Sequence, residues 1–140
     1  MAWLGIVDLG SYTARLVVYD YEPESWYRLI AQIREPIRLG EGLGRDRKLA
    51  APAMRRATDA LKLFADYRQS TGLEDLSVIA TSAVRDAANR KRFLKSVAPL
   101  GLEIELLSGE AEARLSVLPV ANGFPLEEAW VMDLGGGSAQ

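Results

Sequence analysis

The first quarter of the chain has the pattern of β-strands. Residues 3–9 and 14–21 are predominantly apolar stretches, and residues 26–34 follow a period of two. An apolar run of this length is typical of a buried strand, and a period of two is typical of a strand with one buried face. Turn residues separate the three segments, first at Gly10-Ser11 and then at Pro23-Glu24-Ser25. The pattern therefore predicts an antiparallel meander.

The remainder of the chain alternates helical and strand patterns. A polar loop over residues 36–49 comes first, and its Gly40–Gly44 stretch lacks the strand-turn-helix context of a nucleotide-binding loop, so a flexible loop is the default interpretation. Helical spacing of apolar residues then predicts a helix from Pro52 to Gly72. Because strands alternate with helices beyond this point, right-handed crossovers should build a mixed sheet with helices on both faces. The later elements that we expect are a strand over 76–80, a helix from Ser82 or Asn89 to Ala98, a strand over 102–107, a helix from Ser108 to about Ala121 and a strand over 129–134.

Composition narrows the class of protein. The chain has 140 residues, 49% of them hydrophobic, and a net charge of −2. This is globular composition, and the length suits one domain or one lobe of a larger fold. The absence of a basic excess argues against a general nucleic-acid or anionic-membrane partner. No apolar run is close to the length of about 18 residues that a membrane-spanning helix needs. We therefore expect a soluble, cytoplasmic protein.

The chain contains no cysteine and no histidine. Within it, disulfides, thiol nucleophiles, Ser-His-Asp triads and Cys/His zinc sites are therefore excluded. Acid–base chemistry at neutral pH would fall to carboxylates, lysine or tyrosine. A bound metal would need oxygen ligands, which indicates Mg²⁺ or a related cation.

One short phrase occurs at both ends of the chain. Residues 6–11 and 131–138 each form an apolar run that ends in an aspartate, Asp8 or Asp133, followed by a glycine turn with a hydroxyl residue. Such a turn lets backbone N–H groups approach an anion, and the carboxylate can hold Mg²⁺. Two ordinary turns would explain either copy alone, but the pair favours a phosphate chain gripped from both sides.

Two further clusters follow predicted strands. In residues 80–89, hydroxyl groups precede Arg85 at a helix start, which suits a phosphate site but also suits a helix cap with a solvated arginine. In residues 107–115, Glu110 and Glu112 are two positions apart, so on a helix at most one of them would face a cleft. First-turn glutamates often do no more than complement the helix dipole.

Together these phrases resemble the exopolyphosphatase/guanosine pentaphosphate phosphohydrolase (Ppx/GppA) family. The resemblance implies one lobe of the actin-like ATPase (ribonuclease H-like) fold and an Mg²⁺-dependent enzyme that removes terminal phosphate from polyphosphate or guanosine pentaphosphate. Five phrases occur in order over almost the whole chain. They are Asp8-Leu9-Gly10-Ser11, Arg38-Leu39-Gly40-Glu41-Gly42-Leu43, Ala80-Thr81-Ser82-Ala83-Val84-Arg85, Leu107-Ser108-Gly109-Glu110-Ala111-Glu112-Ala113-Arg114 and Asp133-Leu134-Gly135-Gly136-Gly137-Ser138.

The resemblance also implies roles for individual residues. Glu112 matches the glutamate that activates the attacking water, and Asp133 matches a carboxylate at the metal site, where Asp8 is a second candidate ligand. Arg85 matches a contact to substrate phosphate. The remaining implied phosphate-binding residues lie in the two glycine turns: Gly10, Ser11, Tyr12, Thr13, Gly135, Gly136, Gly137 and Ser138.

The chain departs from the family pattern in several places. Tyr12 stands where asparagine is usual, and Ala139-Gln140 stands where Thr-Glu is usual, which removes a carboxylate near the metal site. Family members also continue into a second lobe. We therefore expect residues 1–128 to form the first lobe, residues 129–140 to open the second, and the isolated chain to be inactive. Its last strand would fray, fold back or pair with a second copy as a homodimer.

Two other functions are compatible with these features. One is an ATP-using kinase or ATPase lobe of the same superfamily. The other is a non-catalytic module that senses polyphosphate or an alarmone.

Overall fold

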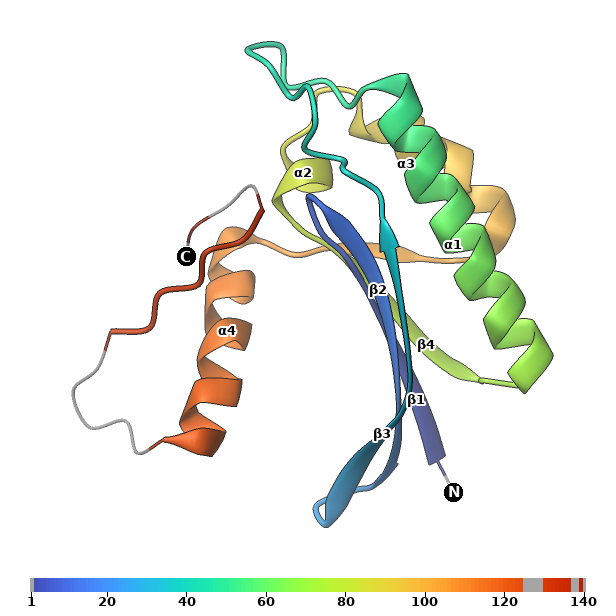
Figure 1. Ribbon diagram of the computed structural model, residues 1–140, viewed down its shortest axis with the longest axis vertical. Coiled ribbons are helices and arrows are strands. Elements are labelled where there is room, and N and C mark those ends of the chain that lie inside the picture. The colour runs from blue at the N-terminus through green and yellow to red at the C-terminus, as the bar shows by residue number, and fades with distance from the viewer. Residues whose placement is uncertain (1, 125–129, 137–138, 140) are drawn as a thin grey trace.

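A mixed five-stranded sheet with strand order β3-β2-β1-β4-β5 forms the centre of the fold (Figure 1). In this computed structural model, residues 2–124, 130–136 and 139 are described. The predicted meander is confirmed, because β1 pairs antiparallel with β2 and β2 with β3, whereas β4 and β5 extend the sheet parallel to β1. The strands are β1 (Ala2–Leu9), β2 (Thr13–Glu22), β3 (Trp26–Pro36), β4 (Asp75–Ala80) and β5 (Ile104–Leu106). The helices are α1 (Ala51–Thr71), α2 (Ser82–Arg85), α3 (Arg90–Val97), the 3₁₀ turn η1 (Ala98–Leu100) and α4 (Gly109–Gly123).

The core lies between one face of the sheet and the helices α1 and α3 (Figure 1). In β1, Val7 and Leu9 are buried on this face, so Asp8 between them points to the opposite face. Phe64 of α1 and Phe93 of α3 are fully buried against the sheet. The predicted first helix is confirmed.

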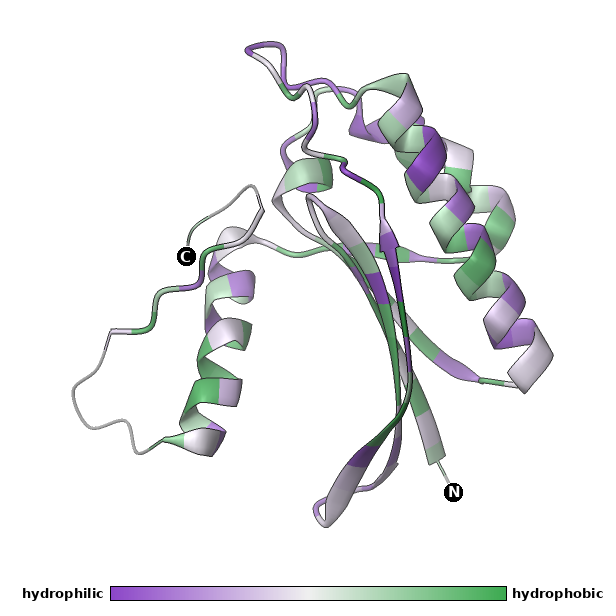
Figure 2. Cartoon of the chain, viewed as in Figure 1, coloured by the Kyte–Doolittle hydropathy of each residue, from purple (hydrophilic) through white to green (hydrophobic). Residues whose placement is uncertain are grey.

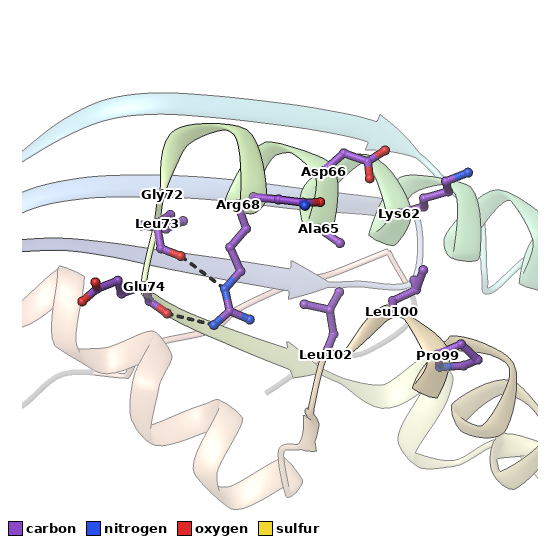
Figure 3. Close-up of a pocket in the computed structure, with 12 residues that line it drawn as sticks. Lys62, Ala65, Asp66, Arg68, Gly72, Leu73, Glu74, Pro99, Leu100 and Leu102 are labelled. Carbon is purple, nitrogen blue, oxygen red and sulfur yellow. Dashed lines mark hydrogen bonds between the residues drawn. The ribbon is translucent and has the colours of Figure 1, made fainter.

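The C-terminal end of α1 is closed by a glycine and an arginine. Gly72 has a φ of 68°, which glycine adopts without strain. Arg68 donates hydrogen bonds from Nε and Nη2 to the carbonyl oxygens of Leu73 and Glu74, at 3.2 and 3.0 Å (Figure 3). These contacts tie α1 to the start of β4 beside an open cavity of about 740 Å³.

Of the two starts predicted for the helix that ends at Ala98, Asn89 agrees with the structure, because α3 spans Arg90–Val97 directly after it. Ser82 instead begins the separate short helix α2, so the chain is broken between α2 and α3. The break arises from contacts with the 36–49 loop. Ala88 N donates to the carbonyl of Arg47 at 2.8 Å instead of continuing a helical ladder. The side chain of Asn89 bonds both N and O of Leu49, at 2.9 and 3.0 Å, and does not cap α3.

Two predicted strands differ from the structure. The strand expected over 102–107 is limited to Ile104–Leu106, because it pairs only with the short parallel end of β4. The strand expected over 129–134 was also wrong: residues 130–133 are irregular, and Leu134 makes one isolated bridge to Ala139. Ala129 lies outside the described residues.

The edge strand β3 is less buried than its alternation predicts. Ala31 and Ile33 pack partly against the core, whereas Tyr27 and Leu29 are exposed. The hairpin of β2 and β3 extends beyond the end of α1 in Figure 1, so no helix covers these positions.

The helix α4 lies on the opposite side of the sheet from α1 and α3 (Figure 1). Helices therefore lie on both sides, as predicted, but no residue of α4 is buried. Among the described residues, no helix is both long enough and apolar enough to cross a membrane.

Replacement of Phe64 by alanine should destabilise the fold strongly. The side chain is 0% exposed, and truncation of such a residue costs about 3–5 kcal/mol through lost burial and the cavity left behind. Leu63→Ala is the matched control, since Leu63 on the same helix is 42% exposed. Chemical denaturation of both variants is the measurement. Equal losses of unfolding free energy would contradict the packing of α1.

Candidate functional site

The candidate site lies where the carboxyl ends of the parallel strands meet. The chain leaves β1 at Gly10, β4 at Thr81 and β5 just before Ser108, all at the same edge of the sheet. Ligands of α/β sheets commonly bind at this edge. A cavity of about 280 Å³ lies here, lined by Asp8, Gly10, Ser11, Tyr12, Thr13, Thr81, Glu112, Asp133, Gly135 and Gly136.

The first glycine turn is held by backbone hydrogen bonds. Gly10 N donates to Thr13 O at 3.0 Å, and Ser11 O accepts from Gly40 N at 2.8 Å. Tyr12 O accepts from the N–H groups of Ile37 and Arg38, at 3.0 and 2.9 Å. The turn is therefore docked on the 36–49 loop.

That loop is in turn fixed by α1. Arg56 donates from Nε to Ile37 O at 2.9 Å and forms an ion pair with Glu41 at 2.9 Å. Gly40–Gly44 forms neither helix nor strand, which agrees with the interpretation as a loop, and its first residue is docked on the glycine turn through Gly40 N and Ser11 O.

The two glycine phrases lie against each other. A Cβ atom built on Gly136 would lie 3.3 Å from Tyr12 Cβ and 3.8 Å from Tyr12 N. The repeated phrases at the two ends of the chain thus meet in one cavity, which their likeness suggested. Gly137 and Ser138 lie outside the described residues.

Glu112 is directed into the site by the start of α4. Ser108 caps the helix by accepting a hydrogen bond from Ala111 N at 3.1 Å. One turn later, Glu112 lines the cavity, whereas Glu110 pairs with Arg114 at 2.8 Å on the exposed surface. The expectation that at most one of the two glutamates faces a cleft agrees with this geometry.

Arg85 is engaged by protein acceptors beside the cavity. Its Nη1 lies 2.9 Å from Glu112 Oε2 and 2.9 Å from Leu107 O. Its Nε and Nη2 lie 3.1 and 3.4 Å from the carboxylate oxygens of Asp86. The hydrogen bond to Glu112 is the main cause that raises the pKa of Arg85, so the guanidinium stays charged.

Asp8 lies in an unfavourable place for a negative charge. Partial burial raises the pKa of Asp8, the charges of Glu112 and Asp133 raise it further, and Arg15 opposes them. Two other carboxylates thus act on Asp8 across the cavity.

Asp133 is tied to α4 by a residue that the sequence did not single out. Ser116 Oγ lies 2.6 Å from Asp133 Oδ2 and 3.1 Å from Glu112 O. Ser116 is four residues after Glu112, so helical periodicity places both on one face. That spacing was the available signal, but the position of Asp133 opposite it could not be read from the sequence.

The carboxylates at this cavity are suitable ligands for a hard divalent cation, but by themselves they do not form a complete metal site. Asp8 and Asp133 both line the cavity. In the part of the chain that is described, no three acidic side chains converge as ready metal ligands. Mg²⁺ commonly takes one or two carboxylates and completes its shell with water and substrate phosphate, so these two residues are sufficient protein ligands.

Two of the three residues that depart from the family pattern, Tyr12 and Ala139, are among the described residues. Tyr12 is 57% exposed, and the guanidinium of Arg38 lies over its ring at 5.6 Å from the centroid. Ala139 makes the bridge to Leu134. Gln140 lies outside the described residues.

Solved structures similar to this chain include members of a phosphatase family. An exopolyphosphatase from Cytophaga hutchinsonii ATCC 33406 matches with a TM-score of 0.88 and 26% identity, covering 98% of this chain and 45% of that one. The Aquifex aeolicus member of the Ppx/GppA family matches with a TM-score of 0.84 and 28% identity, covering 99% of this chain and 45% of that one. The chain therefore spans less than half the length of these relatives.

These matches confirm the predicted actin-like lobe, with its mixed sheet and flanking helices. The family model described as the Ppx/GppA phosphatase family matches residues 17–140. The match begins within β2 and takes in every element after it, and it includes Arg85, Glu112 and Asp133. The chain belongs to the Ppx/GppA phosphatase family.

Proposed function

We propose that the protein hydrolyses the terminal phosphate of inorganic polyphosphate, guanosine pentaphosphate or both, and that this chain supplies the first lobe of the enzyme. The observation that carries the proposal is the meeting of Glu112, two aspartates and two glycine turns in one cavity. The exopolyphosphatase among its structural relatives supports the substrate class.

In this proposal a second lobe covers α4 and the residues after it. Residues 1–128 form the first lobe, and residues 129–140 begin the second. The support is the apolar surface left exposed on this side, part of which appears as the hydrophobic stretch of α4 in Figure 2. Its members are Leu115, Val117, Leu118, Phe124, Trp130, Met132 and Leu134.

Water attacks the terminal phosphorus in line with the leaving phosphate. Glu112 orients this water and takes its proton. Backbone N–H groups of the glycine turns hold the phosphate oxygens, and this charge stabilisation supplies most of the rate increase.

Arg85 links substrate binding to the base. Its Nη1 is bound to Glu112 and Leu107, so an entering phosphate competes with Glu112 for the guanidinium. When phosphate takes this donor, the Glu112 oxygen becomes available to accept a proton from water. Asp86 keeps the guanidinium in place through Nε and Nη2 during the exchange.

Asp8 and Asp133 would hold Mg²⁺, which supplies neutralisation of the charge on the phosphate oxygens. Ser116 orients the Asp133 carboxylate through its 2.6 Å hydrogen bond. Arg15 partly offsets the repulsion that Asp8 experiences from the other two carboxylates.

Glu112→Gln should lower kcat by about 100-fold or more, the usual scale for a general base. The measurement is phosphate release by the two-lobed protein from polyphosphate, guanosine pentaphosphate and ATP. Glu110→Gln is the matched control, because Glu110 lies on the surface with Arg114. Release from ATP alone, or equal losses in both variants, would contradict the proposal.

Arg85→Ala should raise KM by about tenfold or more, the scale of a lost charge-assisted hydrogen bond. A fall in kcat should accompany it, because the exchange with Glu112 is lost. Arg92→Ala removes the same charge from an exposed position of α3 and serves as the control. Unchanged kcat and KM in the Arg85 variant would contradict a phosphate contact and would favour the alternative of a solvated arginine on the helix surface.

Asp8→Asn should raise the melting temperature of the 140-residue chain at neutral pH and reduce its stabilisation by Mg²⁺. A carboxylate with a raised pKa disfavours the folded state once it is ionised, so the gain should vanish below about pH 4, near the ordinary aspartate pKa of 3.8. Thermal unfolding with and without Mg²⁺ measures both effects. Asp75→Asn at the exposed start of β4 is the control. Equal stabilisation of the wild type and Asp8→Asn by Mg²⁺ would remove Asp8 from the metal site.

A further inference from the structure

A second cavity adjoins the candidate site and shares Ser11 and Gly136 with it. Its volume is about 410 Å³, compared with about 280 Å³ for the first. The hydroxyl oxygens of Ser11 and Ser82 lie 3.3 Å apart on its wall. The cavity is lined by Ser11, Gly40, Leu43, Gly44, Arg47, Ser82, Ala83, Asp86 and Gly136.

Arg47 is the cation of this wall. Within the described ranges, its side chain has no carboxylate partner and makes no hydrogen bond, in contrast to Arg56 and Arg85, which form ion pairs. A guanidinium that lines a cavity without a protein acceptor is available for an anionic ligand, and its planar donors match phosphate oxygens.

The backbone of Arg47 is held in an unusual conformation. Its φ is +45°, a region that residues other than glycine seldom occupy. Arg47 N donates to Gly44 O at 3.0 Å, Arg47 O accepts from Ala88 N at 2.8 Å, and Asn89 clamps Leu49 two residues later. Surrounding contacts of this kind sustain strained backbone, which is concentrated at binding sites.

The one acidic residue that lines this cavity is ion-paired. Asp86 contacts Arg85 at 3.1 and 3.4 Å. Arg85 is shared with Glu112 and offsets part of the Asp86 charge, and Arg47 adds a further positive charge to the wall.

The chemistry of the wall favours phosphate over a nucleobase. None of the residues that line this cavity is aromatic. Bases are commonly held by stacking on aromatic side chains, whereas hydroxyls and arginine suit phosphate oxygens. Tyr12 lines the first cavity instead.

We propose that the second cavity binds the inner phosphates of a linear phosphate chain while the terminal phosphate occupies the first cavity. Arg47 is the principal contact, and the chain passes Ser11 and Gly136 between the two cavities. This inference rests on the proposed function. It assigns to this lobe a contribution to the affinity for long chains.

The test compares Arg47→Gln with Arg45→Gln in the two-lobed protein. Arg45 is exposed on the same loop but does not line the cavity, so it controls for loss of one positive charge. Arg47→Gln should raise KM for long-chain polyphosphate about tenfold, the scale of one charge-assisted contact. It should also raise KM for tripolyphosphate, because the second cavity adjoins the first and the inner phosphates of a short chain can enter it. Arg47→Lys should restore part of the loss.

Two results would overturn the inference: no change in KM for the long chain, or an equal effect of Arg45→Gln. If the wild type releases phosphate from none of these compounds, the proposed function fails, and binding decides the inference. Calorimetric titration of the 140-residue chain with long-chain polyphosphate should then show about tenfold weaker binding for Arg47→Gln. Equal affinity of wild type and variant would overturn it.

Discussion

The parallel pairing of β4 with β1 and of β5 with β4 determines where the chemistry of this lobe lies. Parallel strands end at the same edge of a sheet, so the residues that follow β1, β4 and β5 meet although they are far apart in the chain. One cavity is therefore lined by residues from three separate parts of the chain, namely Asp8 with Gly10, Thr81, and Glu112. The connecting helices α1 and α3 cover one face of the sheet, and this packing stabilises the crossovers.

Features that local sequence determines were predictable. The helix ending at Gly72 and the cap at Ser108 depend on residues within one turn of the helix end, and both occur as expected. The glycine phrases were recognisable because a strand, an aspartate and a turn are adjacent in the chain. Their meeting depends on the position of Gly136 beside Tyr12, which follows only from the assembled fold.

Features that depend on distant contacts were not predictable. The break between α2 and α3 is caused by Asn89 and Ala88 bonding the loop about Leu49, which no helical period encodes. The partner of Ser116 is likewise 17 residues away. The strand expected over 129–134 was wrong for a different reason. Its apolar residues favour a strand locally, but a strand also needs a neighbouring strand to pair with.

The outer edge of β3 has a consequence for handling the protein. This strand ends the sheet, and Trp26, Tyr27, Leu29 and Ile30 are exposed along it. An open strand with aromatic and branched side chains recruits strands of other molecules, which leads to aggregates at high concentration. Charged side chains interrupt the apolar stretch at Arg28, which pairs with Asp20 at 3.0 Å, and at Arg34, which is exposed. Charge on an edge strand opposes the stacking of copies, so these arginines favour solubility although they take no part in the chemistry.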